Sequence, residues 1–385
     1  MNDVSVIEGA EEFRKKGYYV YFGESSSLGV NNKINMQIHE LAKSSVVAKL
    51  LISPIRRNVI QRILGLFPFS GNKMDYDTAF RSLVNPDYLY IRRNTTDKDY
   101  IGFLRKVKEK FPRCIIVIEI PTFPIFWDSY CHNFFHLLRS FPDLLREVIY
   151  RGEIKKYIDF FVTFSDQKKI YGVETIRTFN GIIVETVKEV NKQERDNSKI
   201  NLISVASMAP HSGFERLIKG IHKYYQLGGN RNINFKIVGN GKEVKKYLKL
   251  IRKYRIQNHV FCLGERRGTE LDELYNNSDI AVSSLGLYKY RIFIGSFIKI
   301  GEYLSKGLPV LLSCKTKPLN EFHNRFVCEF SNDRNSIDIE KVIEFYDSEI
   351  RREKPFDVVK FNRSFALEYL SMELAMLPIK RRIGI

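Results

Sequence analysis

Two hydrophobic periods alternate along the first half of the chain. Short runs of β-branched and aromatic residues are separated by segments in which apolar residues recur at helical spacing. The predicted strands cover residues 18–23, 46–53, 87–91, 114–120, 159–165 and 176–179, and the predicted helices cover residues 31–43 and 97–111. Strands that alternate with helices are typical of a parallel sheet covered by helices. We therefore expect one doubly wound α/β domain in this half.

The same alternation restarts after a polar stretch at residues 185–199, which has no apolar strand and is the predicted linker. Strands are predicted at 200–205, 234–238, 259–263, 279–283 and 309–312, and helices at 214–225, 242–255, 270–275 and 297–305. We expect α/β domains at residues 1–184 and 199–357, with a C-terminal helix at about 358–385 that packs back on the first. Two doubly wound domains that face each other would place their ligands in a shared cleft at the carboxyl ends of the strands.

The bulk composition narrows the class of protein. A chain of 385 residues suits two domains, and its longest apolar runs are too short to cross a membrane. The N-terminal residues do not form a secretory signal, so we expect a cytoplasmic protein. Five widely spaced cysteines without a Cys-x-x-Cys pair favour reduced thiols over disulfides or a zinc site.

The charge is the unusual bulk property. Sixty-two Lys and Arg residues outnumber 44 Asp and Glu residues, which gives a formal charge of +18. Such a charge favours phosphate-bearing partners, which include nucleic acid, anionic lipid and phosphorylated small molecules. The chain lacks the aromatic-and-basic motifs of the common nucleic-acid-binding modules, so we expect no nucleic-acid partner.

The segment 295–310 carries the most chemical information. Gly295 permits close backbone approach, Ser296 is a candidate helix cap, and the free amides of the following turn suit a diphosphate. Lys299 adds a positive charge, and Glu302 lies one turn later on the same helix face, where its carboxylate suits ribose hydroxyls. Gly307 and Pro309 end the predicted helix. An ordinary strand–helix–strand connection explains the last two residues but not the carboxylate beside Lys299.

This segment resembles the C-terminal motif of glycosyltransferase family 4, whose members have the GT-B fold of two Rossmann-like domains. The resemblance extends over most of the chain. Residues 207–218 resemble the Trp-His-Gly-Tyr-Asp-Arg-Leu-Ile variant that is found in enzymes of capsule and O-antigen synthesis. The other segments that resemble the family are 90–92, 119–124, 235–241, 262–264 and 271–279.

The resemblance implies a retaining transferase that uses a UDP- or GDP-sugar and a lipid-linked glycan acceptor at the inner membrane face. It implies donor-binding roles for His211, Gly213, Gly241, Gly264, Gly295, Ser296 and Phe297, and acceptor-binding roles for Gly29, Glu119 and Thr122. Gly29 also suits a tight strand-to-helix turn. The family needs no metal, because protein cations stabilise the diphosphate, so we expect no cofactor.

Two departures from the family pattern affect this interpretation. The first motif glutamate, which helps to hold the transferred sugar, falls on Ile294. The usual diphosphate-binding arginine and lysine align with Ser207 and Ser212, so we assign their role to Arg216, with help from His211 and Lys299. Arg216, Lys299 and Glu302 are therefore the predicted catalytic residues.

Two alternatives stay open. A sugar-nucleotide epimerase would share the diphosphate site, and the Ile294 departure also allows a catalytically silent partner subunit of a sister transferase. Asp75 and Asp77 have the Asp-x-Asp form of a metal site, but they follow a polar segment and predict only a loop.

One further segment bears on localisation. Residues 54–69 are basic and apolar, with Arg57 and Arg62 toward the edges of the apolar arc of a predicted helix. A helix of this kind suits an anionic membrane surface, although packing on its own sheet explains the pattern equally well.

Overall fold

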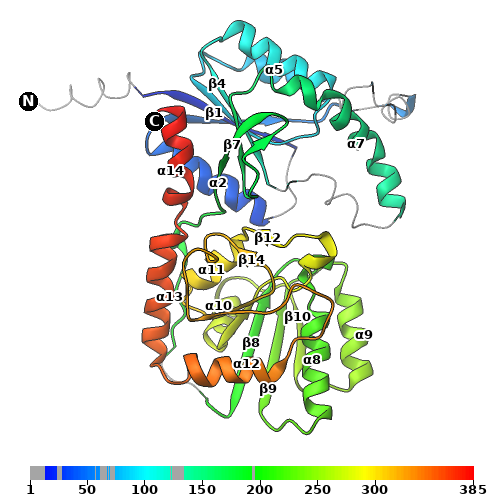
Figure 1. Cartoon of the computed structure of the whole chain (residues 1–385), viewed down its shortest axis with the longest axis vertical. Helices are drawn as coiled ribbons and strands as arrows, with labels where there is room; N and C mark the ends of the chain where they lie inside the picture. The colour runs from blue at the N-terminus through cyan, green and yellow to red at the C-terminus, as the bar shows by residue number, and fades with distance from the viewer. Residues whose placement is uncertain are drawn as a thin grey trace, which may run out of the picture. The chain divides into compact units, whose positions relative to one another are not determined.

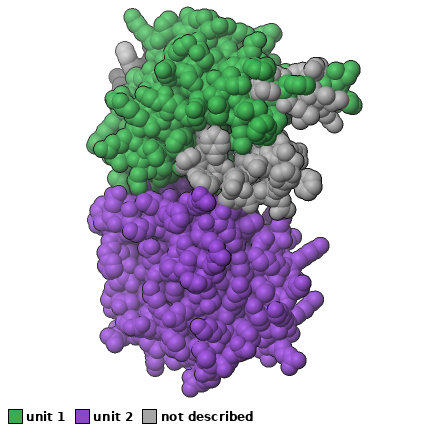
Figure 2. Space-filling model, turned by 45° about the vertical axis from the view of Figure 1, so that its right-hand side comes forward, with its two compact units in different colours: residues 1–179, 372–385 green, residues 180–371 purple. Residues whose placement is uncertain are grey.

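The computed structural model describes residues 14–23, 28–56, 58–60, 67, 69, 74–121, 123, 134–192 and 196–385. The chain divides into two compact units, one formed by residues 1–179 with 372–385 and the other by residues 180–371 (Figure 2). Each unit is built around its own parallel sheet. The sequence-predicted fold class of two Rossmann-like α/β domains is confirmed.

The first unit has a sheet in the order β2-β1-β3-β4-β5-β7-β6. Figure 1 labels β1, β4 and β7 of this sheet. Its strands are parallel except for β6, which pairs antiparallel with β7. The strands are β1 (Lys16–Phe22), β2 (Val46–Ile52), β3 (Tyr88–Arg92), β4 (Ile115–Ile120), β5 (Phe160–Thr163), β6 (Lys169–Ile170) and β7 (Val173–Arg177). The helices are α2 (Leu28–Ala42), α4 (Tyr76–Arg81), α5 (Lys98–Lys110), α7 (Phe134–Ile154) and α14 (Met372–Ile383).

The second unit repeats the plan with a sheet in the order β10-β9-β8-β11-β13-β15, in which every pair is parallel. The strands are β8 (Lys199–Val205), β9 (Asn232–Val238), β10 (Val260–Gly264), β11 (Ile280–Val282), β13 (Val310–Leu312) and β15 (Val327–Glu329), and a small extra sheet pairs β12 (Ile294–Gly295) with β14 (Lys315–Thr316). The helices are α8 (Glu215–Gln226), α9 (Val244–Tyr254), α10 (Gly268–Asn276), α11 (Ile298–Ser305), α12 (Ile339–Phe345) and α13 (Pro355–Tyr369).

The apolar alternation in the strands explains the core of the second unit. Ile200, Leu202, Ile233, Phe235 and Ile237 lie on one face of the sheet and are buried in a cluster with apolar residues of α8 and α12. Successive strand residues point to opposite faces, so the intervening positions form the other face. That second face is less apolar, because it carries Asn201, Asn234 and Lys236.

The C-terminal segment differs from its prediction. Residues 355–383 form two helices, α13 and α14, and not one. Helix α13 packs on α11 in the second unit, whereas α14 packs on α2 in the first, where Thr178 Oγ1 donates to the Ala375 carbonyl over 2.6 Å. Only the last of the two helices therefore returns to the first unit.

A second difference lies near residue 75. The prediction of a loop at Asp75 and Asp77 was wrong, because Asp75 caps α4 by accepting a hydrogen bond from the Thr78 amide, and Asp77 lies in the first turn of that helix. Among the described helices, none combines the length and the apolar character that a membrane span needs.

Candidate functional site

The loops that follow β8 and β11 meet at the carboxyl edge of the second sheet. From β8 the sheet grows to one side through β9 and β10 and to the other side through β11 and β13. Open α/β sheets bind ligands at such a point, where the strand order reverses. The Leu285 amide donates to the Ser212 carbonyl over 2.8 Å, and the Gly286 amide donates to the His211 carbonyl over 3.0 Å. Gly213 has a φ of 63°, and a Cβ there would lie 2.2 Å from the Gly286 nitrogen. Only glycine fits where these loops cross.

The loops that follow β9 and β10 extend the same edge. The Gly239 amide donates to the Gly264 carbonyl over 2.7 Å, and the Met208 amide donates to the Asn240 carbonyl over 2.8 Å. Gly241 has a φ of 147°, and a Cβ there would lie 2.5 Å from the Met208 carbonyl oxygen. Backbone hydrogen bonds thus join the ends of four strands into one platform.

Helix α11 begins immediately after β12, in the small sheet of the same unit. Phe297 is its N-cap residue and provides no side-chain hydrogen bond to the first turn. The first amides of a helix have no carbonyl partner inside the helix, and they attract anions together with the helix dipole. The start of α11 therefore has the backbone chemistry of a phosphate site.

Lys299 and Glu302 lie one turn apart on α11 and are partly buried. Neither side chain has a hydrogen bond or an ion pair with another residue that the structure describes. Burial lowers the pKa of the Lys299 ammonium to about 8, although Glu302 opposes the shift. Burial also raises the pKa of Glu302, and the charges of Lys299 and Lys306 only reduce that shift. Both groups are thus held in a poorly solvated position without full compensation.

Residues 186–355 match the protein-family model described as "Glycosyl transferases group 1". This range includes every element of the platform and α11. We call this matched part of the second unit the group 1 domain.

Solved structures support the fold of the whole chain. A glycosyltransferase from Rickettsia africae ESF-5 has a TM-score of 0.63 at 12% identity, covering 97% of this chain and 99% of that one. Anabaena Alr3699/HepE in complex with UDP has a TM-score of 0.63 at 12% identity, covering 95% and 99%. The lipopolysaccharide outer core galactosyltransferase WaaB has a TM-score of 0.58 at 13% identity, covering 96% and 99%. No curated protein sequence matches the chain.

The group 1 domain brings most of the predicted donor residues to one edge of its sheet. Gly213, Gly241 and Gly264 lie in the joined loops, while Gly295 precedes α11, and a Cβ on Gly295 would lie 2.7 Å from the Phe297 ring. The His211 ring makes an edge contact with Tyr290, with 6.0 Å between ring centroids. Close backbone packing explains Gly213 and Gly241, the Phe297 ring explains Gly295, and Gly264 has a φ of 69°. The loop after β11 places His211.

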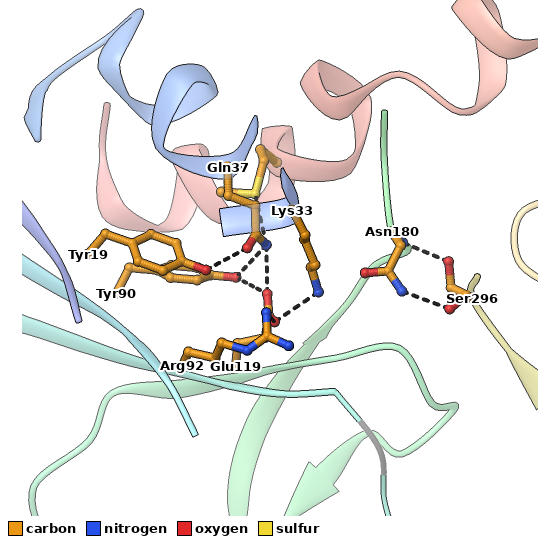
Figure 3. A network of polar contacts seen from close by, with 9 residues as sticks. Tyr19, Lys33, Gln37, Tyr90, Arg92, Glu119, Asn180 and Ser296 are labelled. Carbon is orange, nitrogen blue, oxygen red and sulfur yellow. Dashed lines mark hydrogen bonds and ion pairs between the residues drawn. The ribbon is translucent and has the colours of Figure 1, made fainter. Parts of the chain in front are cut away.

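Ser296 does not cap α11, so that part of the prediction was wrong. Its hydroxyl accepts a hydrogen bond from the Asn180 amide over 2.7 Å, and its carbonyl accepts one from Asn180 Nδ2 over 2.7 Å (Figure 3). Ser296 therefore fixes the segment that enters the second unit. This arrangement leaves the first amides of α11 without a side-chain cap.

Arg216 has a structural environment that does not fit the predicted catalytic role. Its side chain is almost completely buried, and its guanidinium donates to three backbone carbonyls and to one carboxylate. The acceptors are Asn335 O at 2.6 Å, Leu285 O at 2.8 Å, Ser331 O at 2.8 Å and Asp333 Oδ1 at 3.2 Å. A guanidinium engaged in this way joins α8 to two loops, the loop after β11 and the loop after β15, and has little capacity left for a ligand.

Lys289 was missed by the sequence reasoning. Its ammonium donates to the Pro210 carbonyl over 2.9 Å and to the Glu215 carboxylate, which also pairs with Lys246. These contacts hold the loop after β11 against the loop after β8. The available signal was a lysine shortly after a predicted strand that ends at the carboxyl edge of the sheet.

The first unit places Glu119, a predicted acceptor residue, at the carboxyl end of β4 and completely buried. Its Oε1 lies 2.9 Å from Lys33 Nζ and 3.8 Å from Arg92 Nη1. Its Oε2 accepts hydrogen bonds from Gln37 Nε2 at 2.6 Å and from Tyr90 Oη at 2.7 Å (Figure 3). Burial alone would raise the pKa of Glu119, but Lys33, Arg92 and Gln37 lower it to about 2. Glu119 is thus a structural anion inside the unit.

The other acceptor residues give less information. Gly29 lies exposed in the first turn of α2, and Thr122 lies outside the described residues. Across the described ranges, no group of three or more His, Cys, Asp or Glu side chains is placed to hold a metal ion.

Proposed function

We propose that the protein is a retaining glycosyltransferase that moves a sugar from a UDP- or GDP-sugar to a lipid-linked glycan. The observation that carries the proposal is the start of α11, where the first amides have no side-chain cap and the partly buried Lys299 forms no ion pair with any described residue. A diphosphate provides the missing negative charge. The group 1 domain match and the UDP bound by the structural neighbour HepE favour a nucleotide as its source.

The leaving diphosphate determines the proposed mechanism. As the bond between the anomeric carbon and the phosphate oxygen breaks, negative charge grows on the diphosphate, and the α11 amides and Lys299 stabilise that charge. The acceptor hydroxyl forms the new glycosidic bond on the same face and gives its proton to a phosphate oxygen. Glu302 accepts hydrogen bonds from the ribose hydroxyls, and His211 lines the diphosphate side. Arg216 has no direct role in this scheme.

Metal independence is part of the proposal, since Lys299 and helix amides occupy the place of a metal ion. We expect the rate of sugar transfer to be unchanged in excess chelator. A chelator-sensitive rate that is restored by magnesium or manganese would contradict this mechanism.

Membrane docking of the first unit is supported by exposed apolar side chains between residues 55 and 69. The fully described members are Ile55, Val59, Ile60, Phe67 and Phe69, with exposed fractions of 50%, 70%, 68%, 57% and 71%. Arg57 and Arg62, the predicted lipid-phosphate contacts, lie outside the described residues. With the charge of +18, this surface suits an anionic inner leaflet that carries a lipid-linked acceptor.

Vesicle sedimentation tests the docking. The protein should sediment with anionic vesicles and not with neutral ones at low salt, and Val59→Glu with Ile60→Glu should abolish this without reducing nucleotide affinity. Exchange of Val46, an exposed residue of β2, for Glu is the matched control. Equal sedimentation of the double variant and the original would exclude this segment as the membrane contact.

The Ile294 departure favours one competing function, a silent subunit that supports a sister transferase. Ile294 is 39% exposed in β12, four residues before the first residue of α11, and provides no carboxylate there. The deciding experiment incubates the protein with a panel of UDP- and GDP-sugars, with and without acceptor glycolipid. Product that needs acceptor supports the proposal, an altered sugar without acceptor indicates an epimerase, and nucleotide binding without turnover of any donor indicates a silent subunit.

A further inference from the structure

A hollow in the group 1 domain extends from the ends of the strands that lie opposite the platform. It has a volume of about 470 Å³, and its lining residues are Lys192, Asp196, Lys199, Asn201, Asn234, Lys236, Phe261, Asn276, Asn277 and Asp279. Lys199 and Asn201 begin β8, and Asp279 directly precedes β11. The start of β8 at Lys199 is roughly 20 Å of strand from the loop that follows Val205, whereas Lys236 of β9, which pairs with Ile203, is roughly 7 Å of strand from that edge.

The sheet face under the hollow is polar where a parallel sheet is normally apolar on both faces. In β9, Ile233, Phe235 and Ile237 enter the core, while the alternate positions Asn234 and Lys236 form the other face. The neighbouring position of β8 is Asn201, whose Oδ1 accepts from Asn234 Nδ2 over 3.1 Å. Core packing does not require amides and a lysine at these positions.

Two of the three lysines in the hollow are paired with carboxylates. Lys192 Nζ lies 3.0 Å from Asp279 Oδ1, with both side chains nearly buried, and Lys199 Nζ lies 2.8 Å from Asp196 Oδ2. Asp279 Oδ2 also accepts from the Asn201 amide over 2.9 Å. These pairs use both acidic groups of the hollow.

Lys236 is the surplus cation. It is partly buried in the middle of β9, and it has no hydrogen bond or ion pair with any other residue in the described ranges. Burial lowers the pKa of its ammonium, and the nearby Lys199 adds to the shift while Asp279 opposes it. A bound anion would relieve this cost by pairing with the ammonium.

The side-chain amides around Lys236 have both donor and acceptor groups that no described residue uses, and these groups can bind a ligand. Asn276 Oδ1 accepts from the Asn191 amide, which leaves its amino group, and Asn277 Nδ2 donates to the Glu273 carbonyl, which leaves its oxygen. The side-chain amino group of Asn201 and the side-chain oxygen of Asn234 have no hydrogen-bond partner among the described residues. Sugar hydroxyls both donate and accept hydrogen bonds, and the Phe261 ring in the lining offers an apolar surface for a pyranose.

We propose that this hollow is a second ligand site that binds a hexose phosphate, with the phosphate on Lys236 and the hydroxyls on the surrounding carboxamides. The one surplus cation among the described lining residues suits one phosphate group, and the cavity volume is in the range of small-molecule sites. The site is separate from the start of α11, so the inference does not rest on the proposed transfer reaction.

Isothermal calorimetry on the full chain with the 1- and 6-phosphates of glucose, galactose and mannose tests the site. At least one should bind, and Lys236→Gln should weaken it about tenfold, the loss expected for one charge-assisted hydrogen bond. Lys249→Gln, which removes an exposed lysine of α9, is the matched charge control and should leave affinity unchanged. Lys299→Ala should also leave it unchanged, because the two sites are separate.

Four results would overturn the proposal. The first is that no hexose phosphate binds, and the second is that Lys299→Ala loses binding while Lys236→Gln keeps it. The third is that inorganic phosphate binds as tightly as the hexose phosphate, and the fourth is that the unphosphorylated hexose does so. The last two would show that the sugar or the phosphate, respectively, contributes nothing. Retained secondary structure and melting temperature of Lys236→Gln make the comparison valid.

Discussion

Each unit has a Lys–Glu pair near the carboxyl edge of its sheet, and the two pairs are in opposite electrostatic states. In the first unit, Lys33 and Glu119 form an ion pair, and Gln37 and Tyr90 donate hydrogen bonds to the second oxygen of the carboxylate. In the second unit, Lys299 and Glu302 share a helix face, with no ion pair or hydrogen bond to any described residue. Burial lowers the pKa of both lysines to about 8. The carboxyl pKa values diverge, lowered to about 2 for Glu119 and raised for Glu302.

This difference distinguishes a charged pair that stabilises the fold from a charged pair that is available to a ligand. A buried charge that the protein itself neutralises stabilises the fold only as part of its network, and removal of one member leaves the others unpaired. A partly buried charge that the protein does not neutralise costs stability until a ligand arrives. The comparison therefore predicts that variants of the first pair alter stability, whereas variants of the second alter nucleotide binding.

The largest effect is expected for Glu119→Ala. It leaves the Lys33 ammonium buried without its anion, which should lower the free energy of unfolding by about 3–5 kcal/mol. Urea denaturation measures this, and Glu302→Ala is the matched control, expected to lose far less because burial already disfavours its charge. Similar losses for both variants would remove the distinction between the pairs.

The same residue predicts an acid dependence of stability. The pKa of Glu119 falls from an ordinary value of 4.5 to about 2 in the folded protein, so its contribution is complete above about pH 4.5 and is lost as the pH falls toward 2. The unfolding free energy of the original protein should therefore decrease more steeply over this range than that of Glu119→Gln. Parallel pH profiles would contradict the cause given for this shift.

Arg216→Ala should have the next largest effect. Three backbone carbonyls lose their donor, which should cost about 3 kcal/mol at about 1 kcal/mol for each hydrogen bond. At a temperature where the variant is folded, its affinity for UDP should equal that of the original protein in calorimetry. A large loss of UDP affinity without loss of stability would restore Arg216 to the site.

Glu302→Gln should have the smallest effect of the three and act on binding alone. The exchange is nearly isosteric and removes a charged acceptor, so UDP affinity should fall about tenfold while the melting temperature stays equal or rises. Calorimetry and thermal unfolding on the same sample measure both quantities. A loss of stability without a change in affinity would place Glu302 with the structural carboxylates.

The sequence predicted the positions of most strands and helices along the chain because the period of the apolar residues reports directly on burial. It also located α11, since the glycine, lysine and glutamate are close in sequence. The role of Arg216 depends on carbonyls from residues 285, 331 and 335, which no local pattern places near α8. The partners of Glu119 are equally distant, because Lys33 is 86 residues away. Ser296 was misassigned as a cap because Asn180 competes for its hydroxyl.

The most direct test of the central claim is UDP affinity as a function of pH for the original protein, Lys299→Ala and Lys33→Met. The pKa of Lys299 is about 8, so its charge is present at pH 7 and mostly absent at pH 9.5. We predict that the original protein binds UDP at least about tenfold more weakly at pH 9.5 than at pH 7, and that Lys299→Ala binds weakly at both. Lys33→Met should lose stability but, where folded, keep the pH dependence of binding. A Lys299→Ala variant that binds UDP as tightly as the original protein at pH 7 would contradict the account.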